Sequence, residues 1–302
     1  MKKVMQKFVL CLMFVFGTMV LVGTDAKAEL KNGKCGDNVT YSFDSDTRVL
    51  TISGEGPMKD YVAADILKPS SKASPFSIAV SPNDMINSVV IENGVTSIGN
   101  YAFNTGYLKS ITIPDSVTSI GTGAFEDCAF LESVTIPNSV TKIGAKAFKG
   151  DEVLESVTMS DNVTSFGEEV FERTAYYKNS ANWENGILYA GSVLIASSSE
   201  RPSNGFTIKA GTKIIADKAF YSRHLKYGDE IVIPDSVIYI GNYAFQMCYG
   251  MNGVTLGKGV TSIGKSAFEG CVDLNIITID RTVTSIGEDA FKDCALNSIY
   301  HT

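Results

Sequence analysis

One hydrophobic pattern recurs along the chain with a period of about 23 residues. Each copy ends in a Phe that follows Ala or, once, Val, and this Phe returns after steps of 22, 23, 23, 49, 25, 23 and 23 residues. The residues concerned are Phe103, Phe125, Phe148, Phe171, Phe220, Phe245, Phe268 and Phe291. A fixed period of about 20 to 50 residues indicates a repeat architecture, so we expect one unit that is repeated eight times.

Each unit predicts two extended pieces joined by turns. Val134 and Ile136 alternate with polar residues, which is the period of a half-buried strand. Pro137 ends this strand because it has no N–H to donate, and Gly144 permits the bend that leads into the Ala-Phe turn. The apolar positions of this unit are Leu131, Val134, Ile136, Val140, Ile143, Ala147 and Phe148.

So few buried side chains cannot offset the conformational entropy of ordering a whole unit. Stacking buries each unit against two neighbours and adds hydrogen bonds between turns. The sequence therefore predicts a mainly β repeat solenoid with about 23 residues per turn.

The repeated pattern L-x-S-[VI]-x-[IL]-P-x-S-V-x-x-I-G-x-x-A-F-x-x-C resembles the BspA-like, treponemal-type leucine-rich repeats over about residues 86–301. The resemblance implies a leucine-rich-repeat solenoid with a strand in every turn. It also implies a secreted or surface-exposed protein, since family members are commonly linked to adhesion and to contact with host or neighbouring cells.

Two segments depart from the repeat and divide the chain. Residues 29–84 contain two alternating runs around Asp44-Ser45-Asp46, which predicts a β-hairpin that caps the open end of the solenoid, although a separate binding module is the alternative. Residues 172–205 fill the 49-residue step. The expected division is 1–28 leader, 29–84 cap, 85–171 first repeat block, 172–205 aromatic β-hairpin insertion and 206–302 second block with a terminal strand.

The insertion holds two apolar runs around Ala190-Gly191-Ser192, which predict a β-hairpin that replaces part of one turn. It also carries the single tryptophan of the chain. One interpretation is a structural splice whose aromatic residues pack on the neighbouring turn. The other is a protruding ligand-binding loop, because aromatic residues are enriched in binding surfaces. The residues that would carry such binding are Tyr176, Tyr177, Trp183 and Tyr189.

The first 28 residues have the pattern of a secretory signal peptide. Three lysines precede the uncharged run 8–22, which is shorter than the about 20 residues that span a bilayer, and Ala26 and Ala28 fit a small-x-small cleavage site. Cleavage after Ala28 removes four lysines and one aspartate and changes the formal charge from −7 to −10. We expect no transmembrane segment in the mature chain, and free secretion or non-covalent surface attachment, since no sorting motif follows Thr302.

Composition and motifs exclude several functions. A net acidic chain with a pI near 5.0 is a poor binder of nucleic acid. Two histidines and no C-x-x-C pair leave no recognisable metal site, and no nucleophile or phosphate-binding motif is present, so we predict no cofactor, no catalytic residues and no enzyme activity. Glu168-Glu169 lies in the variable part of a turn, where a solvated face is expected.

Cys128, Cys248, Cys271 and Cys294 share one place in the unit, three residues after the Phe. Small polarizable side chains fill interior rows well, which favours buried thiols. Oxidation between adjacent turns is the alternative, because the expected Cα spacing lies within disulfide range.

Rows of hydroxyl side chains are the candidate binding surface. If Val134 and Ile136 point inward, Ser133 and Thr135 point outward and stack with Ser and Thr of other turns. These candidates are Ser110, Thr112, Ser133, Thr135, Ser156, Thr158, Thr255 and Thr278. A second Thr row runs through Thr96, Thr118, Thr141, Thr164, Thr261 and Thr284. The alternative explanation is β propensity, since Thr suits exposed strand positions.

An exported solenoid without catalytic motifs favours a protein that mediates adhesion or protein–protein interaction with an extracellular protein or glycan of a host or neighbouring cell. One alternative is a carbohydrate-binding module that uses the aromatic insertion. Another is a purely structural surface component.

Overall fold

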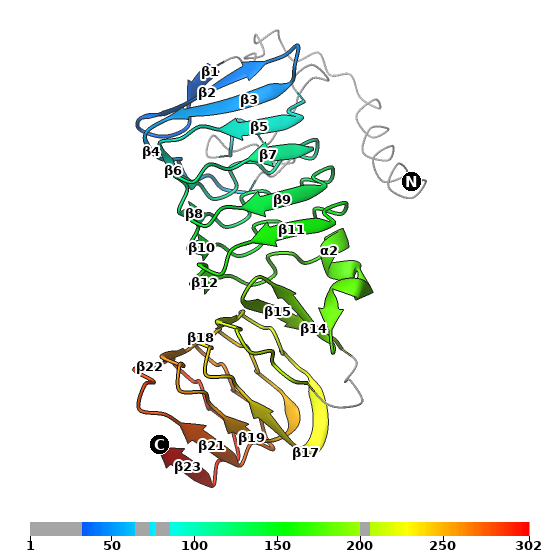
Figure 1. Cartoon of the computed structure of the whole chain (residues 1–302), viewed down its shortest axis with the longest axis vertical. Helices are drawn as coiled ribbons and strands as arrows, with labels where there is room; N and C mark the ends of the chain where they lie inside the picture. Colours follow the sequence, from blue (N-terminus) through cyan, green and yellow to red (C-terminus); the bar gives the residue numbers. More distant parts are fainter. Residues whose placement is uncertain (1–31, 64–72, 77–84, 200–205, 302) are drawn as a thin grey trace, which may run out of the picture.

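The computed structural model describes residues 32–63, 73–76, 85–199 and 206–301. It is a mainly β solenoid with an N-terminal cap and an inserted hairpin, as the repeat predicted (Figure 1). Two repeat blocks follow one another and differ in direction at the insertion. We call residues 88–166 the first block and residues 214–301 the second block. The expected signal peptide lies outside the described residues.

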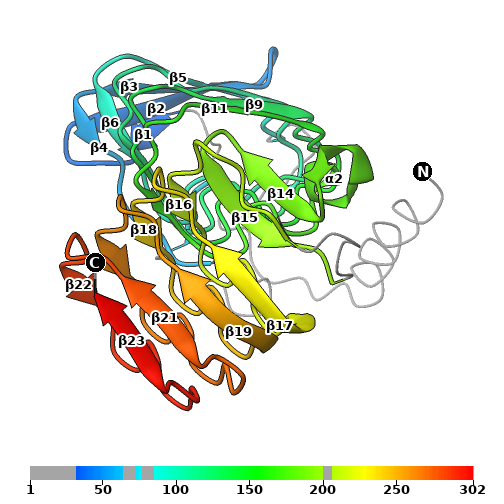
Figure 2. The ribbon, with the colours of Figure 1, turned by 60° about the horizontal axis from the view of Figure 1, so that its bottom comes forward.

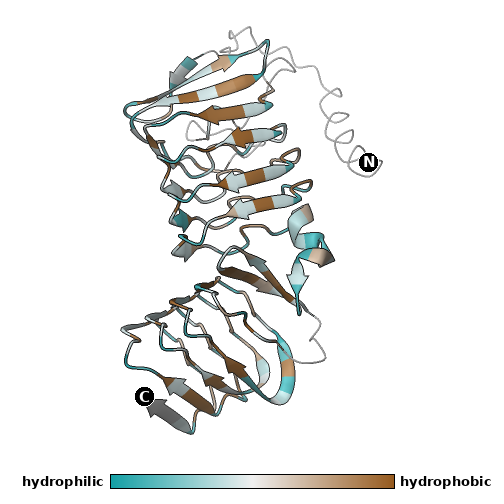
Figure 3. Ribbon diagram, viewed as in Figure 1, coloured by the Kyte–Doolittle hydropathy of each residue, from teal (hydrophilic) through white to brown (hydrophobic). Residues whose placement is uncertain are grey.

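The longer strands of the turns form the wide sheet of each block. Polar and apolar residues alternate along most of them (Figure 3), and in β9, for example, the apolar set is buried. In the cap and first block the strands are β1 (Asn32–Lys34), β2 (Val39–Asp44), β3 (Val49–Gly54), β5 (Ser88–Ile91), β7 (Ser110–Thr112), β9 (Ser133–Ile136) and β11 (Ser156–Met159). In the second block they are β17 (His224–Val232), β19 (Tyr249–Thr255), β21 (Ile276–Ile279) and β23 (Ser298–His301).

Short strands, most of them two residues long, form a second, narrow sheet on another side of each block. In the first block the order is β12-β10-β8-β6-β4, and in the second it is β13-β14-β15-β16-β18-β20-β22. The first set is β4 (Gly56–Pro57), β6 (Val95–Ile98), β8 (Ser119–Ile120), β10 (Lys142–Ile143) and β12 (Ser165–Phe166). The second set is β13 (Trp183–Glu184), β14 (Ile187–Ala190), β15 (Val193–Ser197), β16 (Ile214–Ile215), β18 (Tyr239–Ile240), β20 (Ser262–Ile263) and β22 (Ser285–Ile286).

The repeated Phe side chains form two stacked columns inside the solenoid. Neighbouring ring centroids lie 4.8 to 5.5 Å apart with interplanar angles of 2 to 18°. One column runs from Phe76 to Phe171 and the other from Phe220 to Phe291. Phe76 lies in the cap and extends the first column by one ring, a role that its irregular sequence context concealed.

A left-handed residue lies just before each repeated pair of Ala or Val and Phe, and in every unit except that of Phe103 another lies two residues after the Phe. The residue two before the Phe has a φ of 50 to 59° in all eight units, and it is glycine only at Gly123. A left-handed conformation costs an ordinary residue about 1–2 kcal/mol. Hydrogen bonds between turns offset this cost: Lys146 N–H donates to Glu168 O at 2.9 Å and Phe148 N–H donates to Val170 O at 3.0 Å.

The glycine of the Ile-Gly pair is required for close approach between turns and not for an unusual bend. A Cβ atom added to Gly144 would lie 2.5 Å from the backbone nitrogen of Thr122 in the preceding turn. No left-handed φ occurs at this glycine. The expectation explained Gly144 by a bend. The structure gives a different reason for the glycine: the neighbouring backbone leaves no room for a side chain.

Replacing Gly144 by Ala is expected to lower the free energy of unfolding by about 1–3 kcal/mol, the usual cost of overpacking. The matched control is Gly106→Ala, because an added Cβ there meets nothing within 4 Å and no left-handed φ is involved. Urea denaturation measures both changes. Equal midpoints for the two variants would contradict the close-approach explanation.

The cap continues the first block. β2 and β3 form the predicted antiparallel hairpin, with Phe43 opposite Leu50, and its turn is held by Asp44 Oδ1, which accepts from Asp46 N–H at 2.9 Å. β3 then pairs in parallel with β5, with Leu50 beside Val89. The hairpin therefore covers the open end of the wide sheet and supplies its first parallel neighbour.

The inserted hairpin lies between the two blocks, as Figure 2 shows. It follows the short helices α2 (Ala175–Lys178) and η2 (Ser180–Asn182), and both β14 and β15 are fully buried. Leu188 and Val193 pack into the core of the first block, whereas Ile187 and Leu194 pack into the core of the second. β15 also pairs in parallel with β16, so the hairpin takes the place of a short strand in the second block. It is a wedge buried on both faces.

Candidate binding surface

The wide sheet of the first block exposes the predicted hydroxyl rows. In β9, Val134 and Ile136 are 3% and 2% exposed, while Ser133 and Thr135 lie on the outer face. The register places Ser156 beside Ser133 and Thr158 beside Thr135. The predicted inward and outward orientation is confirmed, because a period of two assigns alternate residues to opposite faces of a strand.

The same rows extend to the strands before β9. Ser110 lies beside Ser88 in the register of β5 and β7, and their Oγ atoms are 2.9 Å apart. Thr112 continues the Thr row, and β7 lies next to β9. The outer face across β7, β9 and β11 therefore presents the side chains of Ser110, Thr112, Ser133, Thr135, Ser156 and Thr158. We call these six residues the hydroxyl face.

The second block presents a different surface at the equivalent positions. Thr255 and Thr278 are in register, as predicted, but Val232 precedes them in β17 and is 60% exposed. Ile276 is exposed on the neighbouring row. The Thr pair is thus separated from the hydroxyl face by the inserted wedge and has apolar neighbours.

The second Thr row has a structural role that its spacing did not reveal. Thr118 Oγ1 donates to Thr96 O at 3.1 Å, and Thr164 Oγ1 donates to Thr141 O at 3.2 Å. Thr284 Oγ1 makes the same bond to Thr261 O at 3.2 Å. Each hydroxyl joins its turn to the preceding one, which favours Thr here beyond its β propensity.

The aromatic residues of the insertion pack against the protein. Trp183 Nε1 donates to Tyr177 O at 2.9 Å, and the two rings meet edge to face at 5.4 Å. Tyr176 Oη donates to Tyr189 O, and Tyr189 is only 6% exposed. The interpretation of Tyr189 as a surface residue is therefore wrong, because its strand lies inside the wedge. Tyr176, Tyr177 and Trp183 are half-buried, which agrees with a structural splice.

Three residues after the Phe lies a column of side chains that is Cys in four turns, and each of these Sγ atoms donates to the carbonyl of the Phe in the preceding turn. Cys128 Sγ donates to Phe103 O, and Cys271 Sγ donates to Phe245 O, both at 3.0 Å. Cys248 and Cys294 make the same bond to the preceding Phe carbonyl. The five cysteines within the described ranges are free, which agrees with the buried-thiol expectation.

Asp151 occupies a place in this column that is cysteine in four other turns. It is fully buried, and its Oδ1 accepts from Cys128 N–H at 2.8 Å, whereas Oδ2 has no hydrogen-bond partner among the described residues. Burial raises the pKa of the Asp151 carboxyl well above its usual value, against the opposing effect of the Cys128 N–H.

The paired acids of the last turn of the first block form ion pairs. Glu169 Oε2 lies 2.6 Å from Lys149 Nζ, and this hydrogen bond lowers the pKa of the Glu169 carboxyl. Glu168 Oε2 lies 2.5 Å from Lys218 Nζ of the second block. The Glu168–Lys218 pair therefore connects the two blocks. No group of three or more His, Cys, Asp or Glu side chains in the described part of the chain could hold a metal ion.

Fold and surface together define a leucine-rich-repeat solenoid. The BspA type leucine rich repeat region matches the chain in six copies over residues 82–192 and 199–302. The chain belongs to this family, which supports a role in protein interaction. The gap between the two matched stretches falls just after the turn of the inserted hairpin.

Several solved structures are similar to the chain. A leucine-rich cell surface protein from Faecalibacterium prausnitzii is 21% identical, with a TM-score of 0.35 over 88% of this chain and 93% of that one. A leucine-rich repeat protein from Eubacterium ventriosum is also 21% identical, with a TM-score of 0.37 over 88% and 95%. The pneumococcal vaccine antigen PcpA is 16% identical, with a TM-score of 0.34 over 89% and 88%. The comparison with curated proteins yields no significant match.

Within the described ranges, no helix has the length and apolar character needed to cross a bilayer.

Proposed function

We propose that the protein is exported and mediates adhesion by binding an extracellular protein of a host or neighbouring cell through the hydroxyl face. The observation that carries this proposal is the exposed, in-register set of Ser and Thr side chains across β7, β9 and β11. Membership of a family of interaction repeats supports it, and the N-terminal signal-peptide pattern supports export.

Hydroxyl groups on a flat sheet suit a broad contact with another protein. Each can donate and accept a hydrogen bond, and a short Ser or Thr side chain loses little rotamer freedom on binding. No charged side chain has to lose its hydration when a partner covers these six positions. Three strands give a partner a surface in which every second residue is available for contact.

Placing two lysines on this face is expected to weaken binding to a matrix protein at least tenfold. The variant is Thr135→Lys with Thr158→Lys, two neighbours in register, since buried ammonium groups without partners are costly. Ser262→Lys with Ser285→Lys is the matched control, because these two residues are also in register but lie on the narrow sheet of the second block. Surface plasmon resonance against a panel of immobilised extracellular-matrix proteins measures the effect.

If the face variant and the control bind the matrix protein with equal affinity, the hydroxyl face is not the binding surface. A glycan array run in parallel tests the carbohydrate alternative. The decisive variant is Trp183→Ala. If it abolishes glycan binding but leaves the near-ultraviolet circular dichroism signal of the other aromatic residues unchanged, the protein recognises carbohydrate and the proposal of protein adhesion is wrong.

A further inference from the structure

The narrow sheets of the two blocks do not join. β12 pairs with β10 and is the last strand of its sheet, while the hairpin strand β15 pairs with β16 in the other sheet. A regular repeat would place its next short strand against β12. The wedge occupies the interior at this point but leaves the outer edge of β12 without a strand partner in the described residues.

Backbone groups on this edge can be identified from the preceding turn. Ile143 O accepts from Gly167 N–H at 3.0 Å, and Thr141 O accepts from Thr164 N–H at 2.8 Å. The equivalent groups of β12 are the N–H and C=O of Phe166 and the C=O of Thr164. They point away from β10 and make no backbone hydrogen bond to another strand within the described ranges.

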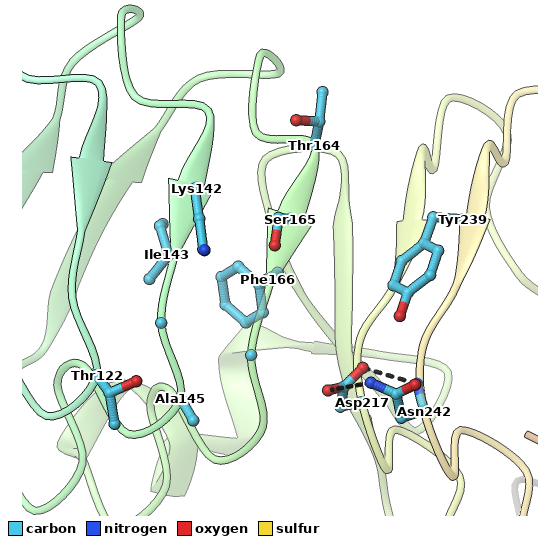
Figure 4. A pocket seen from close by; sticks show the side chains of 12 residues that line it. Thr122, Lys142, Ile143, Ala145, Thr164, Ser165, Phe166, Asp217, Tyr239 and Asn242 are labelled. Carbon is cyan, nitrogen blue, oxygen red and sulfur yellow. Dashed lines mark hydrogen bonds between the residues drawn. The ribbon is translucent and has the colours of Figure 1, made fainter. Parts of the chain in front are cut away.

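A cleft lies along this edge (Figure 4). Its volume is about 370 Å³, one wall is formed by β10 and β12, and the facing wall carries Asp217, Tyr239 and Asn242 from the second block. A smaller hollow of about 160 Å³ shares Thr164 and Tyr239 with it and continues toward Lys213. The edge of β12 is thus reached through a groove and not through an open surface.

Direct contacts between the blocks fix the distance between the two walls of the groove. Lys213 Nζ donates to Asp161 O at 2.8 Å, and the ion pair of Lys218 with Glu168 spans the same junction. The turn of the wedge also packs there, since a Cβ added to Gly191 would lie 3.0 Å from Met159 O. The groove is therefore built into the fold before any partner binds, which lowers the entropy cost of binding.

Asp217 supplies a carboxylate on the far wall. Its Oδ1 accepts from Asn242 N–H at 2.7 Å and its Oδ2 accepts from Asn242 Nδ2 at 3.1 Å. These two bonds use one lone pair on each oxygen and leave the carboxylate able to accept further donors from the groove. No salt bridge to Asp217 is found among the described residues.

We propose that this groove binds an extended peptide segment of a partner protein, which adds as a strand to the free edge of β12 and places a basic side chain at Asp217. Among biological ligands, a polypeptide backbone offers N–H and C=O groups at the spacing that Thr164 and Phe166 present, which is the basis of strand addition. The carboxylate of Asp217, which has no salt bridge among the described residues, selects a cationic side chain by charge complementarity.

This site adds to the interaction role proposed above and is separate from the hydroxyl face. The face lies on the wide sheet, whereas β12 and Tyr239 of β18 lie on the narrow sheets and Asp217 and Asn242 lie in the turns that follow β16 and β18. Substitutions in the groove leave Thr135 and Thr158 unchanged, so each site can fail without the other.

The test begins with random 12-residue peptides displayed on phage and selected on the purified protein. Synthetic versions of the selected peptides are expected to bind Ser165→Tyr at least tenfold more weakly, because the larger side chain fills the groove that Ser165 lines. Ser262→Tyr is the matched control, since Ser262 has the same place in β20, a strand paired on both sides, and less than a twofold change is expected there. Asp217→Asn is expected to weaken basic peptides several-fold.

Two measurements on the unaltered protein do not depend on the folding of a variant. The amide of Phe166 is expected to exchange rapidly with solvent in the free protein and to become protected at saturating peptide, whereas the amide of Ile143 is protected in both states. Methylation of alternate peptide nitrogens is expected to abolish binding, while methylation of the intervening nitrogens is tolerated. Selection of no binding peptide, unchanged exchange at Phe166, or full affinity for Ser165→Tyr would each overturn the proposal.

Discussion

Replacing Phe148 by Ala is expected to lower the free energy of unfolding by about 3–5 kcal/mol, the range for removing a fully buried aromatic side chain. The Phe148 ring has no solvent exposure and lies between Phe125 at 5.1 Å and Phe171 at 5.5 Å. The substitution leaves a cavity in the middle of the column and removes two stacking contacts, each worth about 0.5–1.5 kcal/mol.

The loss should depend on the position of the ring in its column. Phe291 stacks on Phe268 alone and is half-buried, so Phe291→Ala is expected to cost clearly less. Phe130 is 39% exposed, and Phe130→Ala is expected to cost about 1 kcal/mol or less. Urea denaturation at constant m-value compares the three variants.

Because each turn contacts only its neighbours, the Phe148 variant is also expected to uncouple the first block from the second. Unfolding should then proceed in two transitions instead of one. A loss below about 1 kcal/mol for Phe148→Ala would show that the stacked column is not a main source of stability.

Replacing Asp151 by Cys is expected to stabilise the protein by about 1–3 kcal/mol at pH 7, the cost of a buried polar group without a partner. A cysteine here can donate its S–H to Phe125 O, as Cys128 does to Phe103 O one turn earlier. Asp151→Cys thus restores the residue found at this place in four other turns.

The gain should depend on pH, and its sign follows from the raised pKa of Asp151. The folded protein holds the carboxyl proton more tightly than the unfolded chain, whose Asp pKa is about 3.9. Below about pH 3.9 the carboxyl is protonated in both states, and Asp151 then destabilises the folded protein least. As the pH rises from about 3.9 toward the folded pKa, the free energy of unfolding falls. The advantage of the Cys variant should be small near pH 4 and should grow toward neutral pH.

Thermal and urea midpoints between pH 4 and 8 measure this difference. Asp115→Asn is the control, because Asp115 is exposed and its replacement should change stability by less than about 0.5 kcal/mol at every pH. A stabilisation by Asp151→Cys that is the same at pH 4 and pH 8 would show that the carboxyl does not titrate as described.

The repeat, its interior and the outward rows followed from the amino-acid order. Val134 and Ile136 are buried and Ser133 and Thr135 are exposed because a strand alternates its faces with a period of two. Such local rules act within one unit, and eight copies of that unit repeat the same pattern. The hairpin of the cap followed in the same way from alternation around a turn.

Features that arise between turns were decided by the tertiary structure. Gly144 resembles a flexible bend in the sequence, yet it is small because the backbone of Thr122 lies against it. The left-handed residues beside the Ala-Phe pair are mostly ordinary side chains, such as Lys146 and Tyr243, so no glycine marks them. Their cost is offset by hydrogen bonds to the following turn, which a single unit does not reveal.

The insertion shows most clearly which features follow from the sequence and which follow from packing. Its two apolar runs predicted a hairpin, but only the packing decided that both faces are buried, that Tyr189 is an interior residue and that β15 pairs with β16 and not with β12. The groove beside β12 is a consequence of that choice. The pattern of buried positions follows from the local sequence of each unit. The arrangement of the two blocks depends on contacts between residues far apart in sequence, such as Lys213 and Asp161.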